Sequence, residues 1–64
     1  MLVGTIKEWN QLKGWGFIED HDGFDYFVNI SNVKKGFSLK IGIRVKFDVF
    51  HGQRGDEAEN VRPF

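Results

Sequence analysis

The sequence predicts an all-β fold in which five short antiparallel strands close into a small barrel. Apolar and polar residues alternate in several stretches, as they do on strands with one buried face. Polar turns that contain glycine separate these stretches at intervals of roughly 8–12 residues. Closing the sheet suits a chain of only 64 residues, because a barrel leaves no unpaired strand edge.

The first strand is predicted for residues 2–10, where Val3, Ile6 and Trp9 are strand formers. Residues 10–14 form a short polar link that ends in a glycine.

A hairpin with an aromatic face is predicted for residues 13–31. Asp22-Gly23 suits the tight turn between its two strands. Successive side chains on a strand point to opposite faces, so Trp15 and Phe17 share one face, and Phe27 of the partner strand lies beside them. One face of the hairpin therefore has three aromatic rings.

The opposite face of the first hairpin strand has only Gly16 and Ile18, which are too small to form the main buried face. We therefore expect the three rings to lie outside the barrel. Exposed rings let nucleic-acid bases stack while Lys7 and Lys13 contact phosphates. Packing of the rings under a loop or a partner protein is the alternative that this pattern leaves open.

Residues 32–42 are expected to form a long loop, because Gly36 and Gly42 break a segment too short for a stable helix. Residues 43–50 alternate cleanly and predict the fourth strand. A polar, glycine-rich turn follows, and residues 57–61 return as the fifth strand.

The expected core consists of the apolar residues that face inward on these strands. They are Val3, Ile6, Ile18, Val28, Val45, Phe47, Val49, Ala58 and Val61. Tyr26 is also expected to face inward, so its hydroxyl needs a hydrogen-bond partner or a position at the barrel rim.

Composition limits the class of protein. The length allows a single domain, residues 1–64, and the absence of cysteine excludes disulfides and thiolate metal sites. No apolar run approaches the ~20 residues of a membrane helix, and no signal segment precedes the first strand. We expect a soluble cytoplasmic monomer with no membrane partner, cofactor or small-molecule substrate. Nine basic and nine acidic residues cancel, so binding of nucleic acid must depend more on stacking than on net charge.

Metal binding and catalysis are not expected. Asp20, His21, Asp22 and Asp25 lack the ligand spacing and closing glutamate of a calcium loop, and a solvated turn explains them. Ser31 has no histidine placed by a motif to activate it. The sequence therefore predicts a binding protein and no enzyme.

Two motifs in the hairpin resemble the nucleic-acid-binding motifs of the cold-shock protein family. Residues 13–18 read Lys-Gly-Trp-Gly-Phe-Ile, and residues 26–31 read Tyr-Phe-Val-Asn-Ile-Ser. Residues 4–7, 42–47 and 52–55 are similar to the same family, so the resemblance covers essentially the whole chain. It implies an oligonucleotide-binding (OB) barrel, whose aromatic residues on strands two and three stack on unpaired bases of DNA or RNA.

The resemblance also suggests site residues. Lys13, Trp15, Phe17, Phe27 and Phe37 match binding positions of the family. The complete set of candidate nucleic-acid-binding residues is Lys7, Trp9, Lys13, Trp15, Phe17, Phe27, Asn29, Ile30, Phe37 and Arg54.

The chain departs from the family pattern at several positions. Glu8 replaces a stacking tryptophan, Asn29 replaces a histidine and Ile30 replaces a phenylalanine. Trp9, next to Glu8, is expected to be partly buried, and it can join the aromatic face only if a bulge turns it outward. Asp56 stands where a proline is usual.

These observations predict a protein that binds single-stranded RNA or DNA through a surface of stacking aromatics, in the manner of an RNA chaperone or an antiterminator. The alternative is a protein-interaction or fold-only cold-shock domain with weakened affinity for nucleic acid.

Overall fold

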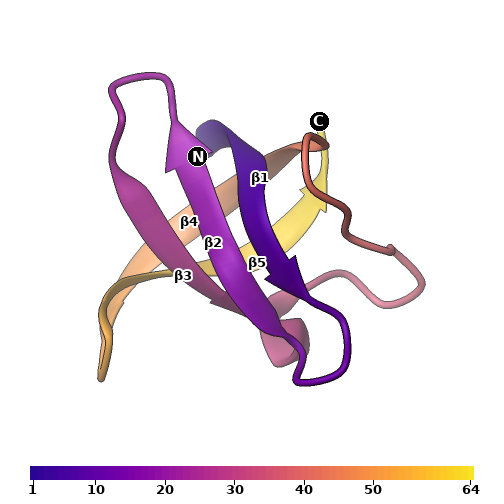
Figure 1. Ribbon diagram of the computed structural model, residues 1–64. Helices are drawn as coiled ribbons and strands as arrows, with labels where there is room; N and C mark the ends of the chain where they lie inside the picture. The colour runs from indigo at the N-terminus through magenta and orange to yellow at the C-terminus, as the bar shows by residue number, and fades with distance from the viewer.

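The computed structural model describes residues 1–64 and contains five strands and one short 3-10 helix (Figure 1). The elements are β1 (Leu2–Asn10), β2 (Trp15–Asp20), β3 (Asp25–Asn29), η1 (Ile30–Asn32), β4 (Arg44–Gly52) and β5 (Gly55–Pro63). The strands close into a barrel in the order β1-β2-β3-β5-β4. The predicted all-β barrel is confirmed. Its strands pair in antiparallel fashion except β3 and β5, which run parallel.

The third strand ends one or two residues earlier than the sequence predicts. The side-chain oxygen of Asn29 accepts a hydrogen bond from the Ser31 backbone N–H at 3.0 Å. This cap starts η1, which diverts the chain from the sheet.

The core contains most of the residues predicted for it. Its fully or nearly fully buried side chains are Ile6, Ile18, Tyr26, Val28, Leu39, Val45, Phe47, Ala58 and Val61. The prediction for Val3 is wrong, because this residue is only half-buried. Gly4 holds the neighbouring inward position, where an added Cβ would lie 2.6 Å from Cγ2 of Ile18. Val3 therefore points to the outer face of β1.

The prediction for Val49 is also wrong, since this side chain is 37% exposed. β4 pairs with β1 only through Phe47, and the β4–β5 register shifts between Lys46 and Asp48. Beyond that shift the two strands continue as a hairpin whose turn projects at the lower left of Figure 1. Val49 lies in this hairpin, where the β1 side of the barrel no longer covers it.

The long loop contributes a core residue that the sequence did not identify. Leu39 is 3% exposed and packs with the barrel core. The end of the loop is fixed to β1, because the Gly42 N–H donates to the Ile6 carbonyl at 2.8 Å and the Ile6 N–H donates to the Ile43 carbonyl at 2.9 Å. Phe37, Leu39 and Ile41 alternate with polar residues, so the sequence contained a signal for an apolar face, but Gly36 and Gly42 on either side favoured a loop.

Candidate nucleic-acid interface

The β2–β3 hairpin places three aromatic side chains together on the outer face of the barrel. Phe17 pairs directly with Phe27, and Trp15 pairs with Asn29 two residues further along the ladder. The Trp15 and Phe27 rings are stacked, with centroids 6.0 Å apart and planes 25° apart. Phe17 meets each of the other two rings edge-on, at 6.2 Å from Trp15 and 5.8 Å from Phe27. We call these three residues the aromatic cluster.

The three rings differ in their exposure to water. Trp15 is 36% exposed and Phe17 is half-buried, but Phe27 is only 6% exposed. The prediction that all three rings lie outside is therefore wrong for Phe27. Both other rings contact Phe27, and the Arg54 guanidinium lies 4.7 Å from its ring centroid, so these three side chains cover it.

Arg54 reaches the aromatic cluster from the turn between β4 and β5. Its backbone N–H donates to Oε2 of Glu57 at 3.1 Å, and Gly55 follows with a positive φ of 87°. β3 and β5 also pair at Phe27 and Glu57, which brings this turn next to β3. A cation over an aromatic face is attracted by the ring quadrupole. Arg54 therefore covers Phe27 and adds a positive charge to the edge of the cluster.

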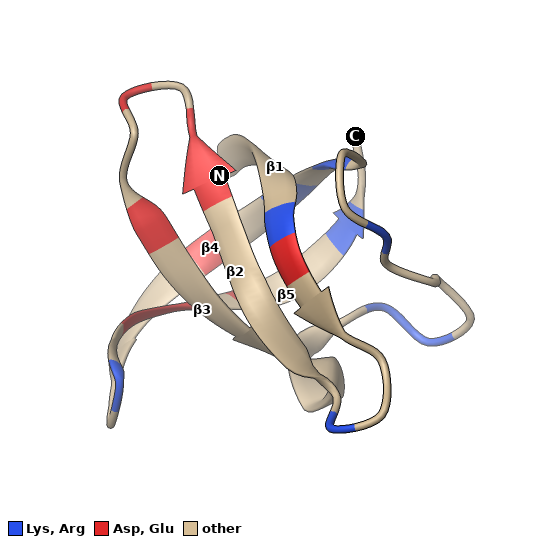
Figure 2. Ribbon diagram, in the orientation of Figure 1, with Lys and Arg blue, Asp and Glu red and all other residues tan.

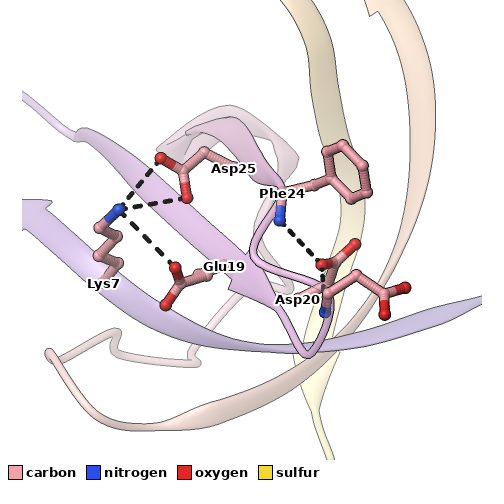
Figure 3. Close-up of polar contacts among 6 residues, drawn as sticks. Lys7, Glu19, Asp20, Phe24 and Asp25 are labelled. Carbon is pink, nitrogen blue, oxygen red and sulfur yellow. Dashed lines mark hydrogen bonds and ion pairs between the residues drawn. The ribbon is translucent and has the colours of Figure 1, made fainter.

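Lys7 contacts two carboxylates of the hairpin. Its Nζ lies 3.2 Å from Oδ2 of Asp25 and 3.9 Å from Oε2 of Glu19 (Figure 3). The hydrogen bond to Asp25, and the charges of Asp25 and Glu19, raise the pKa of Lys7 above its ordinary value. A phosphate that approaches Lys7 must therefore compete with two carboxylates for the same ammonium group.

A bulge in β1 sets the direction of the residues that follow Lys7. Ile6 pairs with Ile18, whereas Glu8 pairs with Phe17, so β1 has one extra residue at this point. Glu8 is exposed and lies on the same face as Phe17. The carboxylate thus extends the row of side chains formed by Phe17 and Phe27.

Trp9 is half-buried and packs against the barrel core, as predicted. Its Nε1 donates to Oε1 of Gln11 at 2.9 Å. Trp9 pairs with Gly16, where a Cβ would collide with the Glu8 carbonyl and the Trp9 Cα, so only glycine permits this approach of the two strands.

A shallow hollow of about 280 Å³ opens beside Trp15. It is lined by Glu8, Trp9, Asn10, Trp15 and Ile41. The two indole rings and the isoleucine make it mainly apolar. Trp9 therefore borders the surface near the aromatic cluster even though it packs against the core.

Four further candidate residues, Lys13, Asn29, Ile30 and Phe37, lie at the ends of the strands or in loops. Lys13 is exposed in the turn before β2, and its backbone N–H donates to Oδ1 of Asn10 at 3.0 Å. Asn29 pairs with Trp15, and Ile30 is 49% exposed at the start of η1. Phe37 is half-buried against the core, so part of its ring faces solvent from the long loop.

Asp20 organises the hairpin turn, a role that the sequence analysis missed. Its Oδ1 accepts hydrogen bonds from the N–H groups of Asp22 at 2.9 Å and Phe24 at 3.0 Å, the second of which is drawn in Figure 3. Its Oδ2 accepts from the Tyr26 hydroxyl at 2.9 Å, which supplies the partner expected for that buried ring. Aspartate immediately before a short turn is the signal that predicts such bonds.

These contacts shift two pKa values. Desolvation raises the pKa of Asp20, but the hydrogen bonds from Phe24, Tyr26 and Asp22 outweigh it and lower the pKa below its ordinary value. The hydrogen bond to Asp20, followed by burial, raises the pKa of Tyr26.

Charge is distributed unevenly over the barrel (Figure 2). Residues 1–32 contain two lysines and five acidic residues, whereas residues 33–64 contain seven cationic and four acidic residues. Four of the five acidic residues of the first half lie in the β2–β3 hairpin, and the fifth, Glu8, lies on β1. The aromatic cluster therefore comes from the more acidic half of the chain. No group of three or more His, Cys, Asp or Glu side chains is placed to hold a metal ion.

A closed five-stranded barrel with an aromatic cluster on the outer face of its hairpin belongs to the OB class. Residues 2–64 match the family described as "'Cold-shock' DNA-binding domain". The chain belongs to the cold-shock domain family.

Curated relatives are similar over nearly their whole length. The chain is 49% identical over 64 residues to "Cold shock protein CspC" of Bacillus subtilis, with 97% of each chain covered. It is 46% identical over 63 residues to "Cold shock-like protein CspLB" of Listeria monocytogenes, covering 95% of this chain and 96% of that protein. It is 44% identical over 66 residues to "Cold shock protein ScoF" of Streptomyces coelicolor, with 98% of each covered. No helix of the structure is long and apolar enough to span a membrane.

Proposed function

We propose that this chain binds single-stranded nucleic acid by stacking unpaired bases on the exposed part of the aromatic cluster. Nucleic-acid binding is the function that family membership supports. The observation on which the stacking proposal depends is the 36% exposure of Trp15, whose ring stacks with Phe27 on the outer face of the paired β2–β3 hairpin. Stacking on such rings tolerates any base sequence, because every base has a π face.

The binding residues have different roles in this proposal. Trp15 and Phe17 provide the stacking surface, with Trp9 and Ile30 at its margin. Arg54 and Lys13 are the cations beside it that contact phosphates. The partner is single-stranded RNA or DNA, and the chain acts as a nucleic-acid chaperone that holds weakly paired segments open, in the manner of an RNA chaperone or antiterminator. The unit that binds is a monomer, because the closed barrel leaves no sheet edge for a second copy.

Tryptophan fluorescence tests the proposal. A base stacked on Trp15 is expected to quench its emission when oligo-pyrimidines of about seven to ten nucleotides are added at micromolar protein. In the Trp15→Phe variant, anisotropy of a labelled oligonucleotide should still report binding while most of the quenching is lost. This control separates Trp15 from Trp9, the second fluorophore.

Two results would contradict the proposal. Neither quenching nor a change in anisotropy would favour the protein-interaction or fold-only alternative, which the paired Lys7 and the nearby acidic residues make a real competitor. Binding with unchanged quenching in Trp15→Phe would show that bases do not contact the aromatic cluster at Trp15.

A further inference from the structure

We propose that Glu8 makes this surface select guanine over thymine or uracil at the position beside Trp15. The inference rests on the proposed function, since it concerns which base enters the hollow next to the aromatic cluster. It depends on three observations: the free carboxylate of Glu8, the apolar hollow, and the single amide donor that lines it.

Glu8 is the acidic residue next to the cluster whose carboxylate has no partner. It pairs with Phe17 across β1 and β2, so its exposed side chain lies at the end of the row formed by Phe17 and Phe27. The neighbouring acids are engaged, because Glu19 lies 3.9 Å from the Lys7 ammonium and Asp20 accepts three hydrogen bonds. No ion pair or hydrogen bond in the structure involves the Glu8 side chain.

The hollow beside Trp15 suits a flat ring with a polar edge. Trp9, Trp15 and Ile41 supply its apolar lining, and Glu8 and Asn10 supply its polar groups. Trp9 Nε1 already donates to Gln11, and Asn10 Oδ1 already accepts from the Lys13 N–H. The polar side-chain groups left for a ligand are the acceptor oxygens of Glu8, the Nδ2 donor of Asn10 and the Nε1 donor of Trp15.

Guanine is the base whose hydrogen-bonding edge matches this set. An ionised carboxylate only accepts hydrogen bonds. Guanine presents N1–H and N2–H₂ side by side, which can occupy both oxygens of Glu8, and its O6 then faces the amide donor of Asn10. Adenine and cytosine each offer one amino group. Thymine and uracil place a single N3–H between two carbonyl oxygens, which the carboxylate repels. Unpaired bases are commonly read on this edge in single strands.

The experiment compares a thymidine heptamer with heptamers that have guanine, inosine, adenine or cytosine at the centre, with affinity measured by quenching and by anisotropy. A carboxylate paired with two donors discriminates by about five- to tenfold at an exposed site, the low end of the range for bidentate contacts. The guanine heptamer should therefore bind about five- to tenfold more tightly than the thymidine heptamer. Inosine lacks the N2 amino group and should lose more than half of that gain.

Two variants assign the preference to Glu8. In Glu8→Ala the guanine and thymidine heptamers should bind within twofold of each other, and the exposed position should leave the melting temperature almost unchanged. Glu59→Ala removes the same charge from β5, outside the aromatic cluster, and should keep the preference. Equal wild-type affinities for all heptamers, or a guanine preference that persists in Glu8→Ala, would overturn the inference while leaving single-strand binding intact. Absence of binding to any heptamer would overturn the proposed function and this inference with it.

Discussion

Trp15 and Phe27 belong to one aromatic cluster but differ in what surrounds them. Trp15 is 36% exposed, whereas Phe27 is 6% exposed beneath Trp15, Phe17 and the Arg54 guanidinium. A ring that faces water is available to a base at little cost to the fold. A covered ring contributes mainly to packing. Truncation of Phe27 should therefore affect the stability of the fold, whereas truncation of Trp15 should affect binding.

Trp15→Ala is expected to weaken binding to a single strand by about 1–3 kcal/mol, the usual loss for one stacked base. The change should alter the free energy of unfolding only slightly. Phe27→Ala should instead destabilise the fold by roughly 3 kcal/mol or more, because it leaves a cavity under the cluster. Urea denaturation measures stability and labelled-oligonucleotide titration measures affinity. If Trp15→Ala greatly lowers stability but leaves affinity unchanged, the Trp15 ring is part of the core and does not form a binding surface.

Glu8→Trp is expected to tighten binding of a short oligothymidine severalfold or more, because a new ring extends the row of Phe17 and Phe27. Glu8→Gln should recover only a small part of this gain, since solvent and salt screen the repulsion between an exposed carboxylate and phosphates. Isothermal titration calorimetry is the appropriate measurement, because the new tryptophan complicates fluorescence. An equal gain in Glu8→Gln would make charge the limiting factor, and no gain in either variant would place the nucleic acid elsewhere.

At the scale of the elements, the β2–β3 hairpin depends on its turn. Asp20 accepts hydrogen bonds from Asp22, Phe24 and Tyr26, and Gly23 adopts a positive φ of 87° inside the same turn. The Asp20 carboxylate therefore links the turn backbone to the buried Tyr26 ring. Because β2 and β3 hold all three rings of the cluster, loss of this turn would loosen the stacking surface as well as the barrel.

The stability that Asp20 supplies should depend on pH. Its pKa is lowered in the folded state from the unperturbed value of 3.8, so its contribution is complete above pH 3.8 and is lost as the pH falls through the folded value. Asp20→Asn should lower the melting temperature at pH 7, and the difference from wild type should shrink below pH 3.8. Thermal unfolding followed by circular dichroism at several pH values measures this. A difference that stays constant down to the lowest pH would assign the effect to geometry and not to charge.

At the scale of the whole molecule, the net charge is zero, but the acidic and basic residues are unevenly distributed along the chain. The half of the chain that contains the aromatic cluster has five acidic residues against two lysines, and one of those lysines, Lys7, is paired with Asp25 and Glu19. Lys13 and Arg54 are the remaining cations close to the cluster. The barrel therefore offers a stacking surface with little positive field around it.

Affinity for a single strand should consequently depend weakly on salt. Each phosphate neutralised on a single strand contributes roughly 0.7 to the slope of log affinity against log salt. Two or three contacts predict a slope with a magnitude of about 1–2. Titrations of an oligothymidine between low and physiological salt measure it. A slope several times steeper would mean that the strand also follows the cationic residues of β4, β5 and the long loop.

The sequence alone was sufficient to predict the strands, the hairpin and the membership of the aromatic cluster. Alternation along β2 and β3 placed Trp15, Phe17 and Phe27 on one face, and Asp22-Gly23 located the turn. These features depend on the period of two along a strand and on the preferences of a few neighbouring residues, which the order of residues contains directly. Alternation alone does not explain β1 beyond Ile6, since a period of two would place Glu8 on the inward face with Ile6. The bulge between Ile6 and Glu8 turns Glu8 outward and Trp9 towards the core.

Only the tertiary structure determined how exposed and how charged the surface is. Arg54 covers Phe27 from a turn 27 residues away, a contact that requires β5 to pair with β3. The Lys7 ammonium pairs with Asp25 because barrel closure places β2 between β1 and β3, and the lysine side chain on β1 reaches across β2 to the carboxylate on β3. Burial of Leu39 and exposure of Val49 depend likewise on where the loop and the β4–β5 hairpin lie relative to the barrel. Such contacts join residues that are distant along the chain, so they depend on barrel closure and strand register, which local alternation does not specify.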